Sequence, residues 1–224
     1  MKRFNINITF LLLSIVILIV SCQSKVKEDK QSRTDVLPYY SEATFTPNWL
    51  EPNSTELKKL HQIPTFNFID QDGEIVTEKT FDDKIYVTDF FFTSCPGICP
   101  AMTKNMNAVQ DAFENDSEVL LLSHSVTPER DSVSVLKNYA EAHGVISGKW
   151  HLVTGNQKDI YNLGRKSYFV EEDLGLQKSA DEFLHTENFI LVDKNKHIRG
   201  IYNGLNKTSI EQLIADIKTL KKEK

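Results

Sequence analysis

The sequence of 224 residues contains only three cysteines, no basic patch with interleaved aromatic side chains and no internal repeat. Without a basic patch, and with a formal net charge of −5, nothing in the chain suggests nucleic-acid binding. Because cysteine is scarce, the sequence does not describe a disulfide-rich scaffold, and each thiol is a candidate for a chemical role.

The N-terminus combines positive charge with an apolar run. Lys2 and Arg3 precede apolar residues that extend from 10 to 20. A charged start, an apolar middle and a small residue at the cut are typical of an export signal. The next residues, Ser21-Cys22, resemble the end of a bacterial lipoprotein signal, in which cleavage precedes the cysteine and lipid is attached to it. The alternative is an uncleaved transmembrane anchor, since the run is close to the length that crosses a bilayer.

Both interpretations place the folded part outside the cytoplasm and attached to a membrane. We expect a lipoprotein-type signal peptide over 1–21, a flexible tether over 22–38 and one domain over 39–224, in a lipoprotein of the bacterial cell envelope. The stretch 25–35 is polar and of mixed charge, as in a flexible linker. Cleavage before Cys22 removes two cations and no acids, so the formal charge changes from −5 to −7.

The other two cysteines, Cys95 and Cys99, follow an aromatic run. Residues 84–92 are rich in β-branched and aromatic side chains, which predicts a buried strand. A Pro-Gly pair ends that strand, and Pro100 suits the first turn of a helix over 101–113. Cys99 is therefore expected at the positive end of the helix and Cys95 in the preceding loop, a setting that lowers the pKa of a thiol.

Two thiolates this close can form a disulfide, attack one, or bind a soft metal ion. A cross-link over three intervening residues would stabilise the fold little, because short loops give the smallest entropic benefit. A purely structural role for the pair is therefore disfavoured.

Strands alternate with helices along the chain, and an antiparallel hairpin and a final helix follow. The predicted strands are 66–70, 74–77, 84–92, 119–126, 150–155, 188–193 and 197–202, with a short one near 43–46. The predicted helices are 101–113, 133–143, 157–164 and 209–220. This order indicates an α/β fold with a mixed β-sheet flanked by helices and an additional N-terminal hairpin.

Among the six histidines, His185 differs from the others. Structural roles suffice for His143 near a helix end and for His151 and His197 in strands. His185 precedes a strand and follows a polar segment, 168–180, that can fold over the sheet. Facing the cysteines, it would complete a Cys, Cys, His set, which suits copper in both oxidation states or zinc.

A family resemblance adds to this interpretation. It lies in the segments 89–100, 123–132, 150–155 and 185–193. These segments are similar to the Sco/SenC family of copper-binding proteins, over roughly 66–220 of this chain. The resemblance implies a thioredoxin-like fold and a copper site, for Cu(I) or Cu(II), formed by Cys95, Cys99 and His185. It also implies that the protein delivers copper to, or keeps reduced the cysteines of, the dinuclear copper centre of cytochrome c oxidase.

Two positions depart from the family pattern. Gly97 stands where many members carry an acidic residue, which removes a negative charge beside the metal. Thr127 stands where many members have Asp before Pro128. His124, in the second similar segment, is expected to have a supporting or packing role.

Three functions remain open at this point. The first is a copper chaperone that uses two thiolates and an imidazole. The second is an extracytoplasmic thiol-disulfide oxidoreductase, in which one of Cys95 and Cys99 attacks a partner disulfide and the other resolves the mixed disulfide. Against it, thioredoxin-type reductases usually have two residues between their cysteines, and His185 has no necessary role in exchange. The third and weakest is a peroxidase of the peroxiredoxin kind.

The lipoprotein prediction fixes the mature N-terminus. Mass spectrometry of the protein purified from bacterial membranes should find a chain that begins at Cys22 and carries lipid mass on that residue. An intact Met1, or a Cys22 without lipid, would contradict the prediction.

Overall fold

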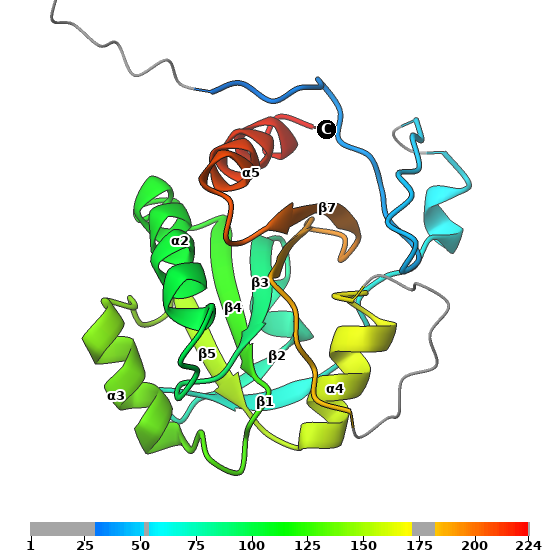
Figure 1. Ribbon diagram of the computed structural model, residues 1–224. Helices are drawn as coiled ribbons and strands as arrows, with labels where there is room; N and C mark the ends of the chain where they lie inside the picture. Colours follow the sequence, from blue (N-terminus) through cyan, green and yellow to red (C-terminus); the bar gives the residue numbers. More distant parts are fainter. Residues whose placement is uncertain (1–29, 52–53, 172–181, 224) are drawn as a thin grey trace, which may run out of the picture.

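A seven-stranded mixed sheet forms the centre of the structure, a computed structural model that describes residues 30–51, 54–171 and 182–223 (Figure 1). The strand order is β2-β1-β5-β4-β3-β6-β7. The strands are β1 (Asn67–Asp70), β2 (Ile75–Thr77), β3 (Ile85–Phe91), β4 (Val119–Ser125), β5 (Trp150–Thr154), β6 (Asn188–Val192) and β7 (Ile198–Asn203). The helices are α2 (Cys99–Ala112), α3 (Val133–His143), α4 (Gln157–Lys166) and α5 (Lys207–Leu220), with 3-10 turns η1 (Leu57–Lys59) and η2 (Glu78–Phe81).

The middle of the sheet is parallel and the two sides are antiparallel. β4 pairs in parallel with β3 and β5, whereas the β1–β2 and β6–β7 hairpins are attached antiparallel to β5 and β3. Every residue of β3 and β4 is buried, as expected for strands that helices cover on both faces. The carboxyl ends of β3 and β4 therefore open at one edge of the sheet, where their connecting loops lie side by side.

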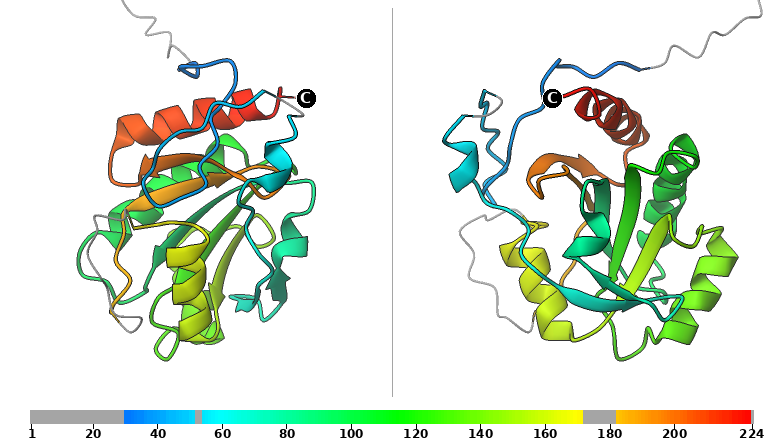
Figure 2. Two further views of the ribbon diagram at one scale, coloured as in Figure 1. Left: turned by 90° about the vertical axis from the view of Figure 1, so that its right-hand side faces the viewer. Right: turned by 180° about the vertical axis from the view of Figure 1, so that it is seen from behind.

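Each face of the sheet has its own hydrophobic core. One core joins the sheet to α2, α3 and α5, and includes Cys99. The other joins it to α4 and the segment before β1. Figure 2 shows α4 on the side of the sheet opposite α2 and α3. Because strand residues alternate between faces, Val87 and Phe91 of β3 belong to the first core, whereas Tyr86 and Phe90 belong to the second.

Most predicted elements are confirmed within one or two residues. The helix after the cysteines begins at Cys99 and not at 101, since the proline follows its first residue. The helix over 133–143 is confirmed, and it ends at Gly144, whose φ of 69° is the left-handed conformation that glycine adopts without strain.

The strand predicted near 43–46 is wrong. That stretch is a turn and irregular chain, and its β-branched residues do not pair. Single bridges form on either side of it instead, from Tyr39 to Asn48 and from Tyr40 to Ile198. Of the predicted polar segment at 168–180, the part from 172 onward lies outside the described residues, as do the signal peptide and Cys22.

The N-terminal arm runs over α5 and β7 (Figure 1). Lys30 Nζ donates to the Thr208 carbonyl at 3.4 Å, and the Leu37 backbone N–H donates to Glu223 at 2.7 Å. The buried Arg199 donates to the Leu37 carbonyl and to Glu223, both at 2.6 Å. The arm is thus fixed to the C-terminal helix. Across the described part of the chain, we find no helix that is both long and apolar enough to cross a bilayer.

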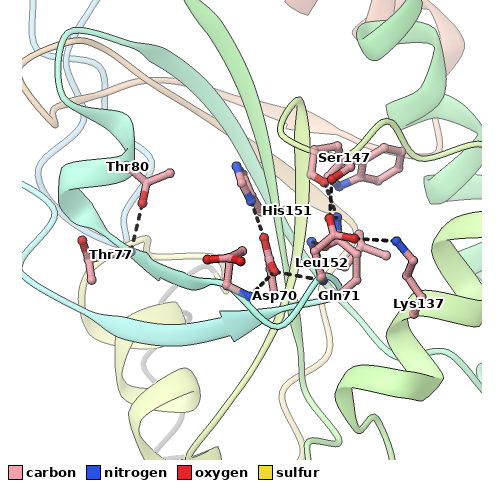
Figure 3. A network of polar contacts seen from close by, with 11 residues as sticks. Asp70, Gln71, Thr77, Thr80, Lys137, Ser147, His151 and Leu152 are labelled. Atoms are coloured by element: carbon pink, nitrogen blue, oxygen red, sulfur yellow. Dashed lines mark hydrogen bonds and ion pairs between the residues drawn. The ribbon is translucent and has the colours of Figure 1, made fainter.

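His151 has the structural role expected of it. Its Nδ1 lies 2.8 Å from Asp70 Oδ2, and the two residues tie β5 to the end of β1 (Figure 3). Asp70 also accepts from the backbone N–H groups of Asp72 at 2.9 Å and Glu74 at 3.0 Å, which closes the β1–β2 turn.

His124 is a fully buried histidine in β4. Its ring stacks on Phe90, with centroids 4.7 Å apart, and its Nδ1 contacts Thr88 Oγ1 at 3.2 Å. Its Nε2 has no hydrogen-bond partner among the described residues. Burial lowers the pKa of this imidazole from 6.5 to about 3, against a smaller raising effect from the Asp89 backbone.

The depressed pKa of His124 predicts a loss of stability in acid. The unfolded chain takes up a proton near pH 6.5, whereas the folded chain takes it up only near pH 3, so His124 destabilises the fold as pH falls through this window. The contribution is about 2 kcal/mol between pH 6.5 and pH 5. Urea unfolding of wild type and His124→Gln at both pH values measures it: the variant should lose less stability in acid by about this amount. Parallel pH profiles would contradict the assignment.

Candidate metal and thiol site

The two cysteines of the domain lie at the turn from β3 into α2. β3 ends at Phe91, and α2 begins at Cys99. Cys99 is 5% exposed and packs in the core beneath α2, whereas Cys95 is half-buried in the loop. Both are free thiols. The predicted positions, one thiol at the helix start and one in the preceding loop, are confirmed.

The surroundings of the two thiols shift their pKa values in opposite directions. Burial opposes ionisation of Cys95, but the backbone N–H groups of Cys99, Gly97 and Ile98 and the Cys99 thiol outweigh it, so the pKa of Cys95 is lowered. The expected low pKa is therefore found for Cys95.

For Cys99 the expectation of a lowered pKa is wrong. Burial raises the pKa of Cys99 to about 12, although the Phe92 backbone N–H favours its thiolate. Hydrogen bonding to Cys95 and the negative charges of Cys95 and Asp89 add to this increase. At neutral pH, Cys99 is consequently protonated.

A buried carboxyl group stands behind the pair. Asp89 in β3 is 2% exposed and accepts a hydrogen bond from the Ser123 hydroxyl. Burial raises the pKa of Asp89 to about 7, partly offset by that bond. Sequence analysis did not identify this residue, because a single Asp in a buried strand gives no signal until the fold places it near Cys99.

His185 lies on the segment that enters β6. Its side chain is exposed, whereas its neighbours Leu184 and Thr186 are 1% and 7% exposed. Thr186 Oγ1 donates to the Val170 carbonyl at 2.7 Å, so the chain after His185 is anchored.

An aromatic contact joins this segment to the cysteine loop. The rings of Phe183 and Phe92 meet edge to face, with centroids 5.5 Å apart. Within the described ranges 30–51, 54–171 and 182–223, however, no three His, Cys, Asp or Glu side chains are grouped closely enough to hold a metal ion. The structure thus brings Cys95 and Cys99 together and leaves His185 outside a three-ligand group.

The structure also places two other positions named from the sequence, His124 and Gly97. His124 lies in the core on the α4 face, whereas Cys99 lies on the α2 face, so the sheet separates them. Gly97 is exposed, and a Cβ added there would approach only the Cys95 sulfur, at 4.0 Å. A Cβ at this position would therefore make only an ordinary van der Waals contact.

Thr127 forms a hydrogen bond with Asp131. Its Oγ1 donates to Asp131 Oδ2 at 3.1 Å. Asp131 also accepts hydrogen bonds from Thr93, which lies two residues before Cys95. Sequence analysis assigned Asp131 no role. In the sequence, Asp131 is notable only for its position just before a helix, and that position does not indicate a contact with the cysteine loop.

Comparison with known proteins identifies the family. The SCO1/SenC family model matches residues 54–222. The crystal structure of a SCO1/SenC family lipoprotein from Bacillus anthracis has a TM-score of 0.63 at 31% identity, covering 72% of this chain and 96% of that one. BsSco, described as a member of the Sco family of cytochrome c oxidase assembly proteins and as having a disulfide switch, has a TM-score of 0.62 at 29% identity, covering 73% and 95%.

A third similar structure has copper bound. ScoI from Bradyrhizobium japonicum, solved with copper, has a TM-score of 0.55 at 26% identity, covering 70% of this chain and 98% of that one. These neighbours and the mixed sheet confirm the predicted fold class, an α/β thioredoxin-like sheet flanked by helices with an additional N-terminal hairpin. With the family model matched along most of the domain, the chain belongs to the SCO1/SenC family.

Proposed function

We propose that this chain is a membrane-tethered copper-binding assembly factor of the cell envelope. It delivers copper to, or keeps reduced the thiols of, the dinuclear copper site of cytochrome c oxidase. Its copper ligands are Cys95, Cys99 and His185, and lipid on Cys22 holds it at the membrane. Family membership, the copper-bound relative and the lipoprotein relative support this proposal.

The paired thiols carry the argument. Thiolates are the soft ligands that Cu(I) prefers, and a loop before a helix leaves Cys95 accessible to an incoming ion. Cys95 ionises first because its pKa is lowered, whereas Cys99 keeps its proton until a metal displaces it. Copper is the cargo of the protein, so a site in which one ligand is half-buried and another exposed suits exchange with an acceptor.

Strand register supports His185 as the third ligand. β6 runs antiparallel to β3 with Thr88 opposite Ile190, so each residue nearer the start of β6 lies nearer the end of β3 and the cysteine loop. Leu184 belongs to the core on the α4 face, whereas the adjacent His185 is exposed and lies outside that core. Because His185 is exposed and outside a metal-binding group in the described residues, copper binding must draw its imidazole toward the thiols.

Anaerobic copper titration tests the ligands. The reduced protein should bind one Cu(I), with release of the Cys99 proton, and should show a sulfur-to-copper charge-transfer band with Cu(II). His185→Ala should weaken copper binding by roughly 10–100-fold or more and alter the band, since even a supporting residue contributes this much. His61→Ala is the control, because His61 contacts the Ser167 carbonyl on the α4 face. An unchanged band and affinity in His185→Ala would show that His185 is not a ligand.

The asymmetry of the two thiols also favours thiol-disulfide exchange as a second function. The Cys95 thiolate would attack a partner disulfide, forming a mixed disulfide and releasing one partner thiolate. Cys99 would then lose its proton and attack the Cys95 sulfur, which releases the second partner thiolate. The partner gains two electrons, and the protein is left with a Cys95–Cys99 disulfide.

Alkylation of the reduced protein tests this order of attack. Iodoacetamide at pH 7 should label Cys95 much faster than Cys99, because only Cys95 has a lowered pKa and an accessible sulfur. Peptide mapping gives both rates. Cys99→Ser should trap a mixed disulfide at Cys95 when a small disulfide is added, whereas Cys95→Ser should react slowly. Equal labelling of the two thiols would contradict the assignment, and rapid disulfide reduction without copper binding would favour the oxidoreductase.

A further inference from the structure

One buried carboxylate gathers hydrogen bonds from both loops at the site. Asp131, between β4 and α3, is 0% exposed. It accepts from the Thr93 backbone N–H at 3.3 Å and from Thr93 Oγ1 at 2.6 Å. The hydroxyls of Ser125 and Thr127 donate to it at 2.5 Å and 3.1 Å. Four donors converge on a carboxylate that water does not reach, so each of them matters.

The hydrogen bonds to Asp131 lie at or just beyond the end of the β3–β4 pairing. The parallel pairing of β3 with β4 ends with Phe91 opposite Ser125, and the last backbone bond runs from the Val126 N–H to the Phe91 carbonyl at 2.8 Å. Thr93 lies beyond that bond. The carboxylate of Asp131 therefore continues the attachment of the cysteine loop to β4 after the sheet itself has ended.

We propose that Asp131 is the positioning residue of the cysteine loop. Through Thr93 it fixes the chain two residues before Cys95, and so holds the Cys95 thiol beside Cys99 and ready for copper or a partner disulfide. The inference rests on the proposed function for the role of Cys95 and adds the residue that holds that thiol in place.

Thr127 belongs to the same arrangement. The Thr127 hydroxyl donates to the Asp131 carboxylate, whereas an aspartate at position 127 could not donate to it when ionised. The threonine found here thus adds a donor to the same carboxylate that accepts from Thr93.

Two substitutions separate positioning from general stability. Asp131→Asn replaces one acceptor oxygen by an N–H₂ donor that faces hydroxyl donors. Thr93→Val removes one hydroxyl donor and keeps the shape of the side chain, so it disturbs the fold least. Thr93→Ser keeps the hydroxyl and should restore the wild-type behaviour.

Asp70→Asn is the matched control. Asp70 is 2% exposed and accepts three hydrogen bonds, but from the β1–β2 turn and His151 (Figure 3). It therefore reports the cost of losing a buried carboxylate that does not contact the cysteine loop.

The experiment has one arm without copper and one with it, on the reduced full chain in detergent. Without copper, amide hydrogen exchange of residues 93–99 should be about tenfold faster or more in Asp131→Asn and Thr93→Val, and unchanged in Asp70→Asn and Thr93→Ser. With Cu(I), competition against bicinchoninate should show roughly 10–100-fold weaker binding in the same two variants, with an altered Cu(II) charge-transfer band.

Each outcome has one meaning. Loop exchange and copper affinity that change no more in Asp131→Asn and Thr93→Val than in Asp70→Asn would overturn the inference. If wild type fails to bind copper, the proposed function is wrong, while faster exchange in the two variants still supports Asp131 as the residue that holds the loop. If Asp131→Asn does not fold, Thr93→Val against Thr93→Ser decides in the same way.

Discussion

The parallel pairing of β3 with β4 is the constraint on which the rest of the structure depends. Seven paired residues on each strand are buried, and their side chains fill the cores on both faces of the sheet. A shift in the register of this pair would therefore expose core residues. Because both strands end at the same edge, the cysteine loop after Phe91 and the loop after Ser125 emerge together. The site is therefore built from two loops whose relative position the sheet fixes.

At that edge, burial raises the pKa of each thiol, whereas hydrogen bonds from backbone N–H groups lower it. Cys99 lies in the core beneath α2, where the cost of burying a thiolate exceeds the help of the Phe92 N–H. Cys95 is less buried and faces several N–H groups at the helix start, so the balance is reversed. One turn of chain thus supplies two thiols that differ in acidity, although the two residues are identical.

The interior of the protein contains two titratable groups whose contributions to stability change with pH in opposite directions. Asp89 holds its proton to about pH 7, so its contribution favours the fold in acid and is lost as pH rises from its ordinary pKa of 3.8. His124 favours the fold above pH 6.5. Because the two pKa values are shifted in opposite directions, these groups oppose each other over mildly acidic pH and reduce the net pH dependence of folding.

The sequence by itself determined the order of the elements and the candidates for the reactive residues. The run 119–122 is apolar throughout, and Gly144 marks the end of a helix, so strands and helices could be located from local pattern alone. The Cys95–Cys99 spacing and the proline after Cys99 likewise placed the thiols at a helix start. The motifs further along the chain were sufficient to identify the family.

Only the tertiary structure decided how these residues interact. Local pattern predicted a low pKa for both thiols. Cys99, however, lies in a core that gathers residues from β3, β4 and α5, far apart in the sequence, and burial in that core raises its pKa. The attachment of Thr93 to Asp131 joins positions 38 residues apart, and the sheet places His124 on the face opposite Cys99. Burial and long-range hydrogen bonding depend on which surfaces meet in space, and the linear pattern of residue types does not specify that.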